Sequence, residues 1–176
     1  MTQIKVLVSL SLILSVANEA IAQDQRPFLS LGVARAGAAA CELYARQNDL
    51  RVAISIKDSA GRLVYFLRMD DVYQKQIELA GTKAETAATT PISTKRLGLA
   101  TSPGHPLAGL VHIDGLTTVE GGEPIRTETG YSIGGVGISG ASPAQDGECA
   151  RIAVEAMIQE HQRQAYASST TSDRTG

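Results

Sequence analysis

Apolar positions recur along this chain with two different periods, which predict helices near its ends and short strands between them. Apolar and small residues follow helical spacing over 33–47 and again over 144–166, so a helix is expected in each segment. The segments 52–56 (VAISI) and 63–67 (LVYFL) are typical of short strands. Turn residues at 58–61 separate them, which predicts a hairpin.

The middle of the chain adds one more helix and a strand interrupted by glycines. A helix is expected over 72–88, with Asp70 or Asp71 as its N-cap. Gly and Pro at 121–124 predict a turn, and 131–139 (YSIGGVGIS) resembles a strand that another group approaches closely. This order predicts an α+β fold: a single compact domain with an antiparallel sheet of about five strands flanked by helices.

The two ends of the chain differ in composition from the middle. Residues 1–22 have the pattern of a secretory signal peptide, with Lys5, an apolar run and small residues before the cleavage position. The apolar run is too short to cross a membrane as a helix; a buried N-terminal strand is the alternative. We expect a folded domain over 23–167, a disordered tail over 168–176, and a periplasmic or secreted location.

The overall composition excludes some classes of partner. The 176 residues include 16 basic and 18 acidic side chains that are scattered along the chain, so no basic patch for nucleic acid is expected. Aromatic residues make up only 4%, which argues against a platform for stacking bases. Beyond residue 22 no membrane span is expected.

The chain contains two cysteines, Cys41 and Cys149, each in one of the two expected terminal helices. In an exported protein an even number of cysteines favours a disulfide, so we predict a Cys41–Cys149 bridge. Two buried reduced thiols are the alternative.

Several segments, taken together, resemble the GlcG/HbpS family, which is also described as a haem-binding or haem-degrading domain family. The similarity extends over about residues 33–160. It implies a compact domain with an antiparallel sheet, a tendency to form homo-oligomers and, in some members, binding of haem or a corrinoid. The segments that carry it are 52–58 with Gly61, 66–70 (FLRMD), 83–87 (KAETA), 121–125 (GGEPI), 134–140 (GGVGISG) and 145–146 (QD).

These matched segments contain the candidate ligand-binding residues. Lys83 and Thr86 share one face of a helix, and Arg68 ends the preceding strand, so the two cations could meet ligand carboxylates at a pocket rim. Gly135 and its neighbouring glycines leave a surface without side chains beside Ser139. That surface could accept a flat ligand, or it could simply pack against a helix or a second subunit.

Three histidines and one aspartate complete the candidate chemistry. His105 and His112 lie in the longest irregular stretch, and either could ligate haem iron. His161 lies in a polar helix end, where a solvated role is expected. Asp146 precedes the last helix, where an N-cap role is more typical than acid catalysis.

Three functions remain open from the sequence. The leading one is an exported protein that binds a small molecule, with haem or a related tetrapyrrole as the cofactor. The second is an enzyme without a redox cofactor, such as an isomerase, lyase or hydrolase that acts on an organic acid. The third is an accessory subunit of an oligomer.

Overall fold

A computed structural model describes residues 27–172 of the chain. The expected signal peptide, residues 1–22, lies outside the described residues, as do the last four residues of the expected tail.

One four-stranded antiparallel sheet forms the centre of the fold, in the order β2-β1-β4-β3. The α+β class is therefore confirmed, while the expected number of about five strands is wrong. The expected turn at 121–124 is also wrong, because these residues lead directly into an edge strand. The strands are β1 (Ala53–Asp58), β2 (Leu63–Arg68), β3 (Gly122–Arg126) and β4 (Ser132–Ser139).

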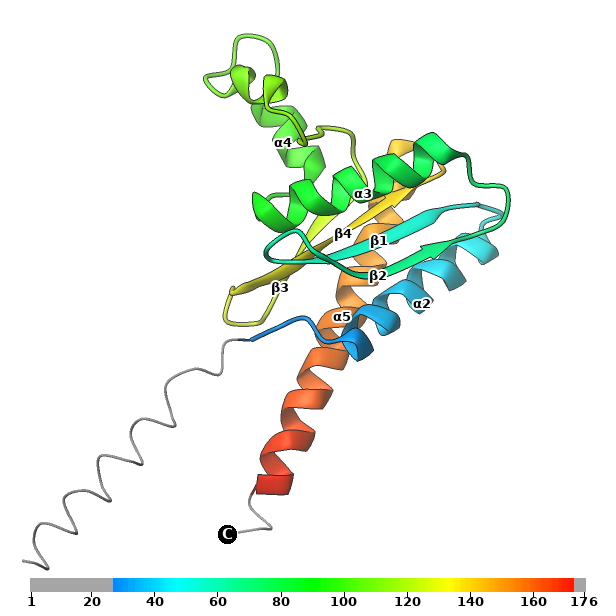
Figure 1. Cartoon of the computed structure of the whole chain (residues 1–176), viewed down its shortest axis with the longest axis vertical. Coiled ribbons are helices and arrows are strands. Elements are labelled where there is room, and N and C mark those ends of the chain that lie inside the picture. The colour runs from blue at the N-terminus through cyan, green and yellow to red at the C-terminus, as the bar shows by residue number, and fades with distance from the viewer. Residues whose placement is uncertain (1–26, 173–176) are drawn as a thin grey trace, which may run out of the picture.

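Helices cover both faces of this sheet (Figure 1). One face carries α3, which packs mainly on β4, and the other carries α2 and α5, which lie side by side. The short helices α4 and η1 belong to a segment that projects away from these layers (Figure 1). The helices are α2 (Leu31–Gln47), α3 (Gln74–Thr89), α4 (Thr94–Ala100), η1 (Ala108–His112) and α5 (Pro143–Ser172).

Two helix ends differ from the expectations. The helix α3 begins at Gln74 and not at 72, and its N-cap is Tyr73, whose N–H donates to Gln76 Oε1 at 3.0 Å. Asp71, one of the two expected caps, has a φ of 62° and belongs to the turn before the helix. The last helix continues past 166 to Ser172, into the segment expected to be a tail.

The predicted disulfide joins the first and last helices. Cys41 of α2 and Cys149 of α5 are both fully buried, and their Cα atoms are 5.0 Å apart across the S–S bond. Around this bond, Ala38, Ala45 and Ala153 contribute side chains small enough to let the two helices approach closely. The disulfide therefore forms part of the core between α2, α5 and the sheet.

Candidate functional site

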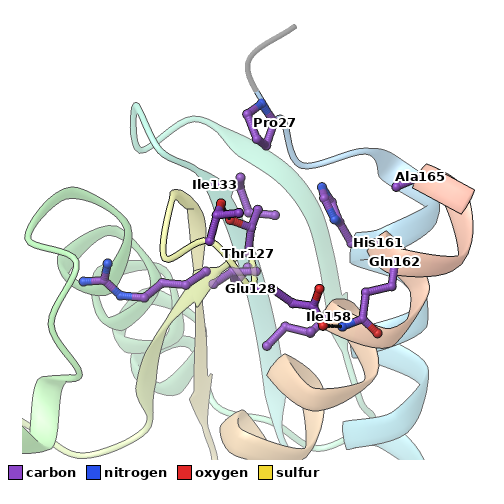
Figure 2. Close-up of a pocket in the computed structure, with 11 residues that line it drawn as sticks. Pro27, Thr127, Glu128, Ile133, Ile158, His161, Gln162 and Ala165 are labelled. Atoms are coloured by element: carbon purple, nitrogen blue, oxygen red, sulfur yellow. Dashed lines mark hydrogen bonds between the residues drawn. The ribbon is translucent and has the colours of Figure 1, made fainter. Parts of the chain in front are cut away.

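A pocket of about 310 Å³ lies between the β3–β4 hairpin and the second half of α5, and it opens to solvent on one side (Figure 2). Its walls include Ile125 of β3, Ile133 of β4 and Ile158 of α5, so most of the surface is apolar. Pro27 closes one end. The volume falls at the lower end of the range typical of small-molecule sites.

An irregularity in the sheet builds one wall of this pocket. Ile125 pairs with Gly134 and Arg126 pairs with Ser132, so Ile133 has no partner on β3. An extra residue of this kind is a β-bulge, which bends a strand and redirects a side chain. Ile133 accordingly lines the same pocket as Ile125.

His161 is the one imidazole in the pocket wall, and it is half-buried. The sequence placed His161 at a polar helix end with a solvated role, and the structure adds that its ring lines this open pocket. Its ring lies on the same side of α5 as Ile158 and Ala165, which are three residues before it and four after it (Figure 2). This helical stripe was visible in the sequence, but the surrounding Gln and Glu residues obscured it.

Two polar contacts organise the edges of the pocket. Gln162 Nε2 of α5 donates to Glu128 Oε1 of the hairpin at 2.6 Å, which joins the two walls (Figure 2). The Arg126 guanidinium donates to the carbonyl oxygens of Gly130 at 3.0 Å and Pro91 at 2.7 Å. The charged side chains at the edge therefore already have partners within the protein.

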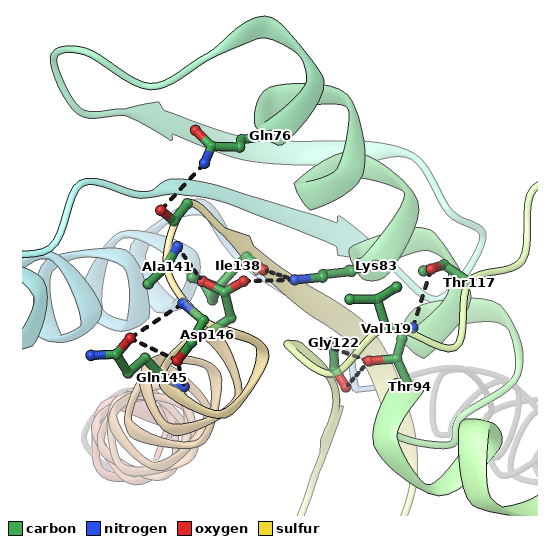
Figure 3. A network of polar contacts seen from close by, with 12 residues as sticks. Gln76, Lys83, Thr94, Thr117, Val119, Gly122, Ile138, Ala141, Gln145 and Asp146 are labelled. Carbon is green, nitrogen blue, oxygen red and sulfur yellow. Dashed lines mark hydrogen bonds and ion pairs between the residues drawn. The ribbon is translucent and has the colours of Figure 1, made fainter.

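A second polar centre lies on the other side of the molecule's core, between α3, the end of β4 and the start of α5 (Figure 3). Lys83 Nζ donates to Asp146 Oδ2 at 2.8 Å and to the carbonyl oxygen of Ile138 at 2.7 Å. The Ala141 N–H donates to Asp146 Oδ1 at 3.0 Å. Burial lowers the pKa of Lys83 and raises the pKa of Asp146, while their contact opposes both shifts.

This arrangement corrects two expectations. Lys83 does not stand at a pocket rim, because it is 0% exposed and lies in the buried stripe of α3 with Ala80, Ala84 and Ala87. Asp146 is not the N-cap of α5; it lies in the first turn, and Ser142 Oγ accepts the Gln145 N–H at 3.4 Å instead. Both charged groups hold elements of the fold together and neither is accessible to a substrate.

The glycine-rich strand packs against α3. A Cβ on Gly135 would lie 2.4 Å from the backbone nitrogen of Ala88, and one on Gly137 would lie 2.2 Å from the carbonyl oxygen of Ala80. Of the two alternatives left open by the sequence, the structure therefore shows close packing of a helix and not a free face for a flat ligand.

The other candidate residues are dispersed. Thr86 is buried, and its Oγ1 accepts the Thr117 N–H at 3.0 Å, which fixes the returning end of the projecting segment. Ser139 is buried at the end of β4. Arg68 is exposed on the edge strand β2, so it does not share a rim with the enclosed Lys83.

His105 and His112 lie on residues 101–119, the part of the projecting segment that follows α4, which we call the arm. Both are exposed, and His105 Nδ1 accepts the Leu107 N–H at 3.3 Å. Neither lines the pocket beside α5. Among the residues that the structure describes, no three His, Cys, Asp or Glu side chains gather to hold a metal ion.

A cluster of charges borders the base of the arm. Glu120 Oε1 lies 3.1 Å from Lys95 Nζ and 3.8 Å from Arg151 Nη1. Glu123 is half-buried on β3, and burial raises the pKa of its carboxyl. The charges of Arg151, Glu120 and Lys95 lie close enough to shift this pKa by smaller amounts. Within residues 27–172 there is no helix both long and apolar enough to span a membrane.

These features define a small α+β domain with two notable sites. One is the buried ion pair of Lys83 with Asp146, and the other is the open apolar pocket that contains His161. The family model described as haem degrading protein HbpS-like matches residues 29–155. The chain therefore belongs to the HbpS-like family, and the resemblance inferred from the sequence is confirmed.

Similar proteins include a curated enzyme and two proteins of known structure. The corrinoid adenosyltransferase PduO of Citrobacter freundii is 36% identical over 125 residues, which cover 70% of this chain and 37% of the enzyme. The chain thus spans little more than a third of that relative. The structure called the PduOC:heme complex is 35% identical with a TM-score of 0.70, covering 74% of this chain and 95% of the other. Klebsiella pneumoniae protein ORFY is 28% identical with a TM-score of 0.71, covering 77% and 94%.

Proposed function

We propose that this protein binds a tetrapyrrole, with haem as its ligand, in the pocket between the β3–β4 hairpin and α5. The observation that carries the proposal is an apolar pocket that contains an imidazole. Membership of the HbpS-like family and similarity to a domain whose structure is described as a haem complex support it. The similarity to a corrinoid enzyme is consistent with the same class of ligand.

The residues present fit such a group. Ile125, Ile133 and Ile158 offer apolar contact to a macrocycle, and His161 offers a nitrogen to its iron. Because the pocket is open on one side, the carboxylates of the ligand would remain in solvent, where they need no buried cation. When bound, haem would supply an iron centre that accepts small ligands or electrons.

The proposal includes export, with residues 1–22 as a signal peptide. The Cys41–Cys149 disulfide supports it, because such bonds persist in oxidising compartments and are rare in the cytosol. Expression of the full chain in a Gram-negative host, followed by mass measurement of the periplasmic product, tests it. A product that starts at Gln23 is expected; an intact chain retained in the cytoplasm would contradict export.

The proposal also includes self-association through the arm. Leu107, Val111 and Ile113 are each 45–50% exposed there, and Asp114 is the arm's one charged residue. Exposed apolar surface with little charge is typical of interfaces between permanently associated copies. Light scattering after size exclusion should show an oligomer that dissociates in Val111→Glu; a monomeric wild-type protein would refute this part.

Haemin titration of the oxidised protein tests ligand binding at the pocket. Saturable binding is expected in the wild-type protein and should be lost in Ala165→Trp, because the added ring would fill the pocket from α5. Glu155→Trp is the matched control, since it adds the same bulk at an exposed position of α5 outside the pocket. Unsaturable binding, or equal binding by both variants, would contradict the proposal.

A further inference from the structure

We propose that His161 is the sole protein ligand to the iron of a haem in this pocket, and that the opposite coordination position is left to a small exogenous ligand. The inference rests on the proposed function and deepens it by assigning the coordination.

The position of His161 on α5 directs its ring to the pocket. Ile158, His161 and Ala165 follow one another at spacings of three and four residues, and all line the cavity. The helix around them is regular, because α5 is continuous from Pro143 to Ser172. A ligand on a helix that is packed on one side is held in a defined place before the cofactor arrives.

The ring of His161 is available for coordination. In the part of the chain that the structure describes, the hydrogen bonds occupy neither of its ring nitrogens. The carboxylate in the pocket wall that could compete for the imidazole is that of Glu128, and it already accepts a hydrogen bond from Gln162 at 2.6 Å. The imidazole therefore faces the cavity without an internal partner to displace.

No second iron ligand faces it across the cavity. The described walls contain no Met, Cys, Tyr or further His; opposite α5 they consist mainly of Thr127, Ile133 and their neighbours on the hairpin. His105 and His112 are on the exposed arm and do not line the pocket. A single imidazole that faces a hairpin wall without a second imidazole, thiolate, thioether or phenol favours an iron that remains open to small ligands.

The assignment concerns a part of the chain beyond the family match. The family model ends at residue 155, whereas His161, Gln162 and Ala165 follow it on the same helix. The family match therefore does not extend to this wall of the pocket, so the assignment is tested on this protein itself.

The test compares two probes, ferric haemin and metal-free protoporphyrin, on the oxidised wild-type protein and His161→Ala. Both proteins should bind the metal-free probe equally, as followed by fluorescence. Only the wild-type protein should give the absorption and EPR spectra of iron with one imidazole, and cyanide should bind to it readily. Free imidazole should restore the spectrum of His161→Ala, because the truncated side chain leaves room for it. The double variant of His105→Ala and His112→Ala should behave as wild type.

The outcomes separate the two proposals. If the wild-type protein binds neither probe, both the proposed function and the assignment fail. If it binds both probes but His161→Ala gives the same haemin spectrum, only the assignment fails. A spectrum of two histidine ligands in the wild-type protein would also overturn it. Since His161 is half-buried on a helix surface and alanine favours helices, the variant is expected to fold.

Discussion

Replacing Gly137 by alanine should push α3 away from the sheet and destabilise the fold. The added Cβ would lie 2.2 Å from the Ala80 carbonyl oxygen and 2.3 Å from the Ala84 backbone nitrogen, whereas real Cβ atoms essentially never come closer than 3.0 Å. Both atoms belong to the helix backbone, so no side chain can rotate away. The helix must shift by close to an ångström, which would also strain the contact of Lys83 with Asp146.

The cost of this shift should reach about 3 kcal/mol, the upper end for overpacking in a core. With a urea dependence of about 2 kcal/mol per molar, the midpoint of unfolding should fall by about 1.5 M. Gly81→Ala on the same helix is the control, because nothing lies within 4 Å of its added Cβ. That variant should gain about 0.5–1 kcal/mol from helix propensity. Equal midpoints for Gly137→Ala and wild type would refute the packing argument.

Three further predictions concern the buried and half-buried polar groups. Lys83→Ala should lower the free energy of unfolding in urea by about 3–5 kcal/mol, because it leaves the Asp146 carboxylate buried without a counterion. The double variant of Lys83→Met and Asp146→Leu should recover most of that loss, since it removes both charges. Equal losses in the single and double variants would contradict this reading. Burial raises the pKa of Glu123 in the folded protein above its ordinary 4.5. The wild-type protein therefore loses stability as the pH rises from 4.5 through the raised pKa of the folded state. Glu123→Gln should therefore raise the melting temperature at pH 7 but not below pH 4.5, and a gain independent of pH would exclude the explanation. Denatured, non-reduced protein should contain no free thiol, and reduction of Cys41–Cys149 should cost about 4–5 kcal/mol.

The elements that the sequence pattern predicted well are those with strong local signals. The hairpin of β1 and β2 follows from two apolar runs around turn residues, and α2 follows from helical spacing. The strand β3 was missed because Pro124 and its adjacent glycines look like a turn. An edge strand tolerates proline, since one of its sides needs no ladder hydrogen bonds, and Pro124 pairs with Gly135.

The site was harder to predict, because it depends on contacts between distant segments. Lys83 lies on the same stripe as Ala80 and Ala84, but its burial depends on Asp146, which is 63 residues away. The pocket depends on a bulge at Ile133 that faces α5. Nothing local to His161 indicates that the bulge is its neighbour, so its place in the pocket wall could be found only once the chain was folded.

The Cys41–Cys149 bond also imposes an order on biosynthesis. The chain holds two cysteines in all, so the first has no wrong partner within its own molecule. It emerges 108 residues ahead of the second. At about 5–20 residues per second, it waits roughly 5–20 s as a reactive thiol. During that interval the Cys41 thiolate can attack a disulfide of another molecule, which forms a mixed disulfide and releases one thiolate of that molecule. The native bond then forms by the same exchange once Cys149 has emerged, when the Cys149 thiolate attacks the mixed disulfide and the second sulfur of the other molecule leaves as a thiolate.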